Sequence, residues 1–184
     1  MSEITHYDLS RATAERFVKD YKVVVFEYQS HASGEFPDVL CFKGGTTTLF
    51  EVKVSRSDFL SDPKKESRKK WRSKVGLYMV GRDRKDESRQ LYKLMAENPD
   101  LFYIEAPHLG RNRYYVCPWG MIDQKEVPEG WGLYWYRESD GKFFLKKRSG
   151  NFRRDIHSEL SIVTHALRKY ASEGPQANIL VDRY

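Results

Sequence analysis

The sequence predicts an α/β fold in which a mixed central sheet is flanked by helices. Residues 1 to about 73 have the pattern of one helix, three strands and a second helix, an order typical of helices packed on a sheet. A Gly-Gly pair between two strand-like segments predicts a tight hairpin within that sheet. Apolar residues make up 40% of the chain and aromatic residues 14%, which excludes a disordered or low-complexity chain.

The length of 184 residues fits one domain with its own core. We therefore expect residues 1–184 to form a single domain with a loose tail from about residue 172. The N-terminus has no signal-peptide pattern, and no apolar run approaches the roughly 20 residues of a membrane span. The two cysteines lie in apolar segments and are expected to be reduced, so we expect a cytoplasmic protein with no membrane partner.

The N-terminal segment predicts a helix followed by a strand. Asp8 or Ser10 can cap a helix that ends near Lys19, because either side chain can accept from the free backbone N–H groups of a first turn. The segment Val23–Tyr28 is β-branched and aromatic, which is typical of a strand.

The hairpin comes next, at Gly44-Gly45. Glycine adopts the positive φ values that tight primed turns need, and apolar segments flank the pair on both sides. If the glycines form a two-residue turn, the pairing register places Asp38 directly opposite Glu51. Lys53 lies two residues beyond Glu51 and shares its face, because strand side chains alternate.

The rest of the chain predicts further helices and strands. Ser55–Asp58 forms a capping box, so a helix is expected from Ser55 to about Ser73, with Pro63 tolerated near its start. Asp155 caps a last helix, which apolar residues at helical spacing support: Ile156, Leu160, Val163 and Leu167. The other predicted elements are the hairpin strands 36–42 and 46–54, a strand at 75–80, a helix at 86–97, and strands at 103–106, 114–117 and 133–136.

The opposed carboxylates of Asp38 and Glu51 are candidate metal ligands. Like charges directly opposite each other destabilise a hairpin, so this pair needs compensation. A divalent cation compensates two acids better than one lysine does, and carboxylate oxygens with the backbone carbonyl of Val52 suit Mg²⁺ or Mn²⁺. The alternative is an ion network of Asp38, Glu51 and Lys53 that only fixes the register.

Two further residues are additional candidates for this site. His31, in a polar loop, is a candidate ligand or base, and the alternative is an ordinary loop histidine. Glu15, on the first helix, faces either the site or solvent, and solvent is favoured. We assign no role in the site to Glu27 or Glu35. The cysteines and histidines lack zinc-ligand spacing, and no Walker or GxGxxG motif supports nucleotide hydrolysis.

The net charge of +6 is concentrated in two basic segments, Lys64 to Lys74 and Lys142 to Arg154. Such segments suit a polyanionic partner, most often nucleic acid, although a solvated face is the alternative. Tyr134, Trp135 and Tyr136 either stack on bases or belong to the core. The candidate phosphate contacts are Lys64, Lys65, Arg68, Lys69 and Arg72, expected on one side of the second helix, and Lys146, Lys147 and Arg148 near the C-terminus.

The hairpin residues also resemble a family signature. Pro37-Asp38, twelve further residues and Glu51-Val52-Lys53 resemble the PD-(D/E)xK motif of restriction-endonuclease-like nucleases. The stretch Glu51-Val-Lys-Val-Ser-Arg-Ser-Asp-Phe-Leu-Ser-Asp-Pro-Lys64 is similar to the segment after the active-site strand of MmcB-like DNA-repair nucleases. Two later segments also resemble that family: Tyr114-Tyr-Val-Cys-Pro118 and Val127-Pro-Glu-Gly-Trp-Gly-Leu133.

The resemblance implies a restriction-endonuclease-like αβββαβ core with an insertion after the second core helix, at about residues 75–111, where the chain departs from the family. It also implies an Mg²⁺- or Mn²⁺-dependent deoxyribonuclease acting in DNA repair or phage and host DNA processing. It implies that Asp38 and Glu51 bind the metal, that Lys53 is the catalytic lysine and that DNA is the partner. Many nucleases of this superfamily act as dimers, so a homodimer is compatible with it. Two alternatives stay open: a catalytically silent DNA-binding module of the same fold, and an interaction protein that acts on a host partner.

Overall fold

The computed structural model describes residues 4–28, 36–62, 71–72, 97, 103–104, 109–176 and 178–182. The chain divides into two compact units, one made of Met1–Asp62 and Pro107–Tyr184 and the other of Pro63–Ala106. The second unit overlaps the insertion expected at about 75–111 and begins earlier in the chain. In the described part of the chain, no helix has both the length and the apolar character needed to cross a membrane.

The first unit contains three helices and seven strands among its described residues. In chain order these are α1 (His6–Tyr21), β1 (Val23–Phe26), β2 (Val39–Lys43), β3 (Thr46–Val52), α2 (Arg56–Ser61), β6 (Asn112–Pro118), β7 (Gly132–Arg137), β8 (Lys142–Lys147), α6 (Ile156–Glu173) and β9 (Ile179–Val181). In the second unit, β4 (Trp71–Arg72) pairs with β5 (Tyr103–Ile104).

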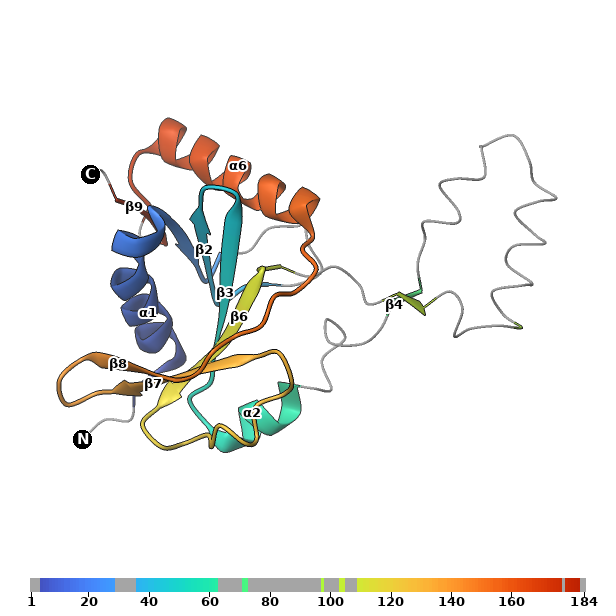
Figure 1. Cartoon of the computed structure of the whole chain (residues 1–184). Helices are drawn as coiled ribbons and strands as arrows, with labels where there is room; N and C mark the ends of the chain where they lie inside the picture. The colour runs from blue at the N-terminus through green and yellow to red at the C-terminus, as the bar shows by residue number, and fades with distance from the viewer. Residues whose placement is uncertain are drawn as a thin grey trace. The chain divides into compact units, whose positions relative to one another are not determined.

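A mixed seven-stranded sheet forms the centre of the first unit, with the strand order β8-β7-β6-β3-β2-β1-β9 (Figure 1). The central strands β3, β6 and β7 are parallel, and the remaining pairs are antiparallel. Two apolar cores cover the two faces of the sheet. One contains Leu9, Ala14 and Phe17 of α1, and the other contains Phe59 of α2 with Ile162 and Ala166 of α6. The prediction of a mixed sheet flanked by helices is confirmed.

Helix α1 begins earlier than its sequence pattern predicts. Thr5 is the N-cap and accepts from the Asp8 backbone N–H at 3.1 Å, so Asp8 lies in the first turn. The predicted caps Asp8 and Ser10 are therefore wrong, because a Thr-x-x-Asp box begins three residues before Asp8. This earlier start makes His6 the first residue of the helix.

Helix α2 is much shorter than predicted. Ser55 is its N-cap, as predicted, but the helix ends at Ser61. The Asp62 N–H already bonds to the Phe59 carbonyl, and Pro63 has no N–H to continue the ladder. A helix through Ser73 is wrong, because Arg72 belongs to strand β4.

The C-terminal elements also differ from the prediction. Asp155 is the N-cap of α6, as predicted, but Ile156, Leu160 and Leu167 are exposed, and the helix buries Ser158, Glu159, Ile162 and Ala166. The predicted loose tail is wrong, since Ile179–Val181 pairs with β1 as an edge strand. Strand β8, rich in lysine, was not predicted. Of the helix expected at 86–97, only Glu97 is described, and it is helical; the strand expected at 75–80 lies outside the described residues.

A buried carboxylate fixes α6 to the sheet. Glu159 accepts from the Thr47 hydroxyl at 2.7 Å, the Gly110 N–H at 2.8 Å and the Arg154 guanidinium at 2.6 Å. Burial of an ionised carboxylate is costly unless the carboxylate is paired and hydrogen-bonded. Here the guanidinium supplies the opposite charge, and the hydroxyl and the backbone N–H supply further hydrogen bonds. Arg154, part of the second basic segment, thus neutralises an internal acid.

The close approach of β3 to the start of β6 requires glycine at position 110. Gly110 has a φ of +83°, and a Cβ there would lie 2.7 Å from the Leu49 Cβ and 2.8 Å from the Leu49 backbone nitrogen. We expect Gly110→Ala to lower the free energy of unfolding by about 2–4 kcal/mol, from left-handed strain and overpacking together. Urea unfolding measures this, with Gly45→Ala as the control, because a methyl group at Gly45 would meet no atom within 4 Å. Equal effects of the two substitutions would contradict the prediction.

Candidate functional site

The β2–β3 hairpin has the register that the sequence predicts. Lys43 pairs with Thr46, and Val39 pairs with Phe50. Asp38 directly precedes β2, and this register carried one step further places it opposite Glu51. The Asp38 carboxylate accepts from the Val52 backbone N–H at 2.7 Å, while its carbonyl accepts from the Glu27 N–H at 2.8 Å. Asp38 is therefore fixed between β1 and β3.

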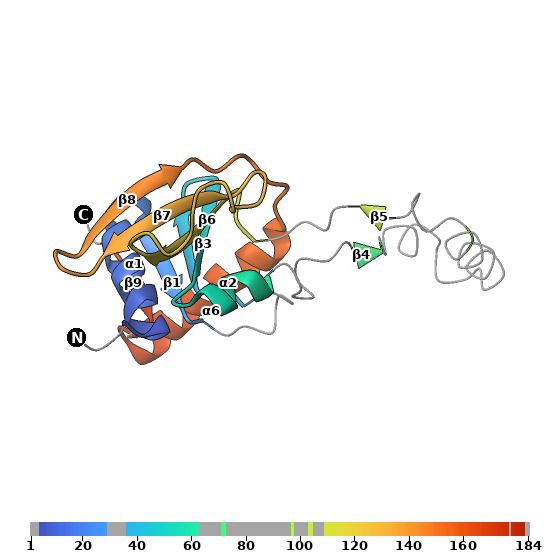
Figure 2. The ribbon, with the colours of Figure 1, turned by 90° about the horizontal axis from the view of Figure 1, so that it is seen from below.

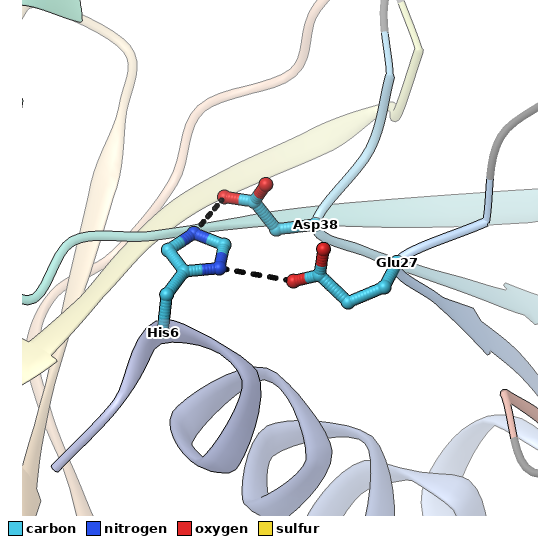
Figure 3. Close-up of side chains that lie close together, drawn as sticks. All are labelled: His6, Glu27 and Asp38. Carbon is cyan, nitrogen blue, oxygen red and sulfur yellow. Dashed lines mark ion pairs between the residues drawn. The ribbon is translucent and has the colours of Figure 1, made fainter.

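A histidine and a second acid lie beside Asp38 (Figure 3). His6 Nδ1 is 3.0 Å from Glu27 Oε1, and His6 Nε2 is 3.4 Å from Asp38 Oδ2. Glu27 leaves β1 with a φ of +47°, and its carboxylate also accepts from the Ser10 hydroxyl at 2.7 Å. The hydrogen bond to Asp38 raises the pKa of His6, against the opposing effect of burial. All three side chains are partly exposed.

A buried ion network surrounds Lys53, the residue after β3. Lys53 Nζ is 2.9 Å from Asp62 Oδ1, 3.6 Å from Glu51 Oε2 and 3.8 Å from Asp58 Oδ1. Lys53 is 1% exposed, Glu51 3% and Asp62 0%, and the Tyr115 hydroxyl donates to Asp62 at 2.7 Å. Burial alone lowers the pKa of the Lys53 ammonium, but the negative charges of Glu51 and Asp62 outweigh it and raise that pKa.

The donor atoms of the exposed group fit a divalent cation. One imidazole nitrogen and two carboxylate oxygens, from His6, Glu27 and Asp38, lie within 4.8 Å of one another. Carboxylate oxygens suit Mg²⁺ and Mn²⁺, and an imidazole nitrogen favours the softer of these ions. Within the described residues, Glu51 is not part of this group, since its carboxylate lies in the Lys53 network.

The sequence thus predicted part of the site. Asp38, Glu51, Val52 and Lys53 gather at one end of the hairpin, as expected. Glu15 faces solvent on α1, the favoured one of its two alternatives, and it pairs there with Arg11 at 2.8 Å. His31 lies outside the described residues. Three neighbours of the site were not among the predicted site residues: His6, Glu27 and Asp62. The Thr-x-x-Asp box was the signal that could have placed His6 at a helix start.

The predicted phosphate contacts divide into four groups. Lys64, Lys65, Arg68 and Lys69 lie outside the described residues. The backbone of Arg72 belongs to β4, so a helical stripe that includes Arg72 is wrong. Lys147 donates to the carbonyl oxygens of Val127 at 2.8 Å and Pro128 at 3.2 Å, which gives it a structural role. Lys146 and Arg148 are exposed on and beside β8.

Comparisons with known proteins bear on the fold alone. No protein-family model matches the chain, and no curated protein is similar to it. A solved structure, the SPO1766 protein of unknown function from Silicibacter pomeroyi, is similar in fold, with a TM-score of 0.50 and 16% sequence identity. The match covers 91% of this chain and 92% of that chain.

Proposed function

We propose that the protein is a metal-dependent deoxyribonuclease with a restriction-endonuclease-like core. The observation that supports this most is the juxtaposition at one hairpin end of the His6–Glu27–Asp38 group and the Glu51–Lys53–Asp62 network. The Val52 N–H connects the two, because it donates to Asp38 from the strand that carries Glu51. The element order α1-β1-β2-β3-α2, followed by β6, is consistent with an αβββαβ core.

The chemistry of phosphodiester hydrolysis explains the two groups. Asp38, Glu27 and His6 would hold Mg²⁺ or Mn²⁺, with Glu51 opposite Asp38 on the neighbouring strand. Such an ion supplies positive charge to a phosphate and acidifies water. Lys53 stays protonated beside Glu51 and Asp62, so it contributes positive charge to the site and is not a general base.

One observation favours a second candidate, a DNA-binding module of the same fold without turnover. Lys53 and Glu51 are almost completely buried, and Asp62 holds the Lys53 ammonium inside the protein. A network of this kind can serve the fold alone. The two candidates differ in one measurable property, which is hydrolysis of DNA in the presence of a divalent ion.

The test is cleavage of labelled single- and double-stranded DNA with Mg²⁺, Mn²⁺ or EDTA. We expect cleavage only with a divalent ion, and we expect Glu27→Gln to lower its rate by about 10- to 100-fold, as loss of a metal-site partner does. Glu15→Gln is the matched control, because Glu15 lies on α1 in an exposed ion pair, and it should leave the rate unchanged. Binding of DNA without cleavage under any of these conditions would favour the silent module.

A further inference from the structure

An aromatic surface lies on β7, β8 and the residue after β6. Trp119, Trp135 and Phe144 form it, and we call these three rings the β7–β8 aromatic face. Trp119 lies 5.3 Å from Trp135 and 4.8 Å from Phe144 between ring centroids. Trp119 is 49% exposed, although indole is among the most costly side chains to leave in water. The exposed ring at the centre of a packed aromatic group therefore points to a ligand.

Two cations accompany these rings. The Arg137 guanidinium lies 4.7 Å from the Phe144 ring and 5.4 Å from the Trp119 ring. Lys146 Nζ lies 4.4 Å from the Trp135 ring and 6.0 Å from the Trp119 ring. Asp140 neutralises Arg137 at 2.6 Å, whereas Lys146 has no carboxylate partner among the described residues. The face thus offers an exposed π surface beside an ammonium that no described carboxylate neutralises.

The β7–β8 aromatic face shares a side of the sheet with Glu51. Glu51 pairs with Tyr115, which pairs with Leu133, and two residues further along the same strands Cys117 pairs with Trp135. Trp135 in turn pairs with Phe144. Because side chains two residues apart share a face, Trp135 and Phe144 lie on the Glu51 side. Figure 2 shows β7 and β8 as the continuation of the sheet beyond β3 and β6.

We propose that the β7–β8 aromatic face binds unpaired nucleotides of single-stranded DNA, with a base stacked on Trp119 and a phosphate near Lys146. An exposed indole accepts the flat face of any base, and an ammonium beside it accepts the phosphate that follows. In a duplex the base faces are already stacked, so the face selects single strands. The role of this face in guiding substrate to a nuclease site rests on the proposed function. The binding of single strands does not, because binding requires no cleavage.

Tyr134 and Tyr136, for which the sequence left base stacking and core packing as alternatives, belong to the core and not to this face. Both pack with the core on the α1 side of the sheet. Leu145 pairs with Tyr134 and therefore also faces that side, although it is 41% exposed. Leu145 is accordingly a matched control: an exposed apolar residue of β8, adjacent to both Phe144 and Lys146 but pointing away from them.

The test is the affinity of the full chain for fluorescein-labelled oligo(dT) and for a duplex of the same length, measured by anisotropy in EDTA so that metal-dependent cleavage cannot occur. We expect single strands to bind more tightly, and Trp119→Ala to weaken that binding by about 5- to 150-fold, the range for loss of one stacked base. Leu145→Ala should leave it unchanged. Lys146→Gln should reduce the slope of log affinity against log salt by about 0.7, the value for one single-strand phosphate, while Lys43→Gln at the hairpin tip should not.

The outcomes separate this proposal from the proposed function. The binding proposal is overturned if both Trp119→Ala and Lys146→Gln leave the affinity unchanged, or if the duplex binds more tightly, even when the wild type cleaves DNA. A protein partner is then the better occupant of the β7–β8 aromatic face. Trp119-dependent binding of oligo(dT) supports it even if no divalent ion elicits cleavage. Circular dichroism of each variant confirms that a loss of affinity is not a loss of fold.

Discussion

Replacement of Asp38 by asparagine is expected to lower the rate of the proposed Mn²⁺-dependent DNA cleavage by about 100- to 1,000-fold, the range for loss of one electrostatic group from a catalytic site. Asparagine keeps an oxygen that can accept from the Val52 N–H, which Asp38 does at 2.7 Å, so the hairpin should keep its register. The substitution removes the negative charge that His6 and a divalent ion would share.

Two readouts make the Asp38 result specific. The affinity for Mn²⁺, measured by calorimetry, should fall at least about tenfold, the smallest effect expected for a metal-site partner. Affinity for DNA in EDTA should stay the same or increase, because one negative charge is removed. Asp20→Asn is the control, since Asp20 lies on the exposed part of α1 and forms an ion pair with Arg16 at 2.8 Å. Normal cleavage and normal Mn²⁺ affinity in Asp38→Asn would refute the metal site.

The second large effect concerns stability. We expect Lys53→Met to lower the free energy of unfolding by about 3–5 kcal/mol, because it leaves the buried carboxylates of Asp62 and Glu51 without their cation. Asp62→Asn should also destabilise the protein, although its amide oxygen can still accept from Tyr115. The free energy of unfolding of the double variant should fall by less than the sum of the two single effects. Each substitution removes a buried charge that the other leaves without its partner.

Urea unfolding of the two single variants and the double variant measures this coupling. The matched control is the exposed pair of Arg16 and Asp20, with the substitutions Arg16→Met and Asp20→Asn. An exposed pair four residues apart on a helix contributes only about 0.3–0.5 kcal/mol, so this second cycle should show little coupling. Additive effects at Lys53 and Asp62 would contradict a coupled network.

The hairpin could be predicted because its information is local. Gly44 has a φ of +53°, and the two-residue turn that it forms with Gly45 fixes which residues pair across β2 and β3. Once the turn is known, strand periodicity alone places Glu51 and Lys53 on one face. The same local rules identified the caps Ser55 and Asp155, which accept from backbone N–H groups three residues later.

The rest of the site depends on packing between distant segments. His6 meets Glu27 only because α1 lies against β1, and Glu27 has a positive φ that its sequence does not announce. The sequence pattern places Asp62 inside a long helix, so its position at the end of α2 beside Tyr115 could not be foreseen. The buried face of α6 likewise includes a charged residue, Glu159, which hydropathy patterns assign to the surface.

The Lys53–Asp62 ion pair lies at the end of the first stretch of the chain that belongs to the first unit. Asp62 is the last residue of the first unit before Pro63–Ala106 begins, and it also lies closest to Lys53 of the three described acids that pair with it. Linkage is reciprocal: a ligand that binds more tightly when Asp62 holds the Lys53 ammonium must strengthen that ion pair by the same free energy. The strength of the Lys53–Asp62 ion pair and the affinity for such a ligand would therefore change together.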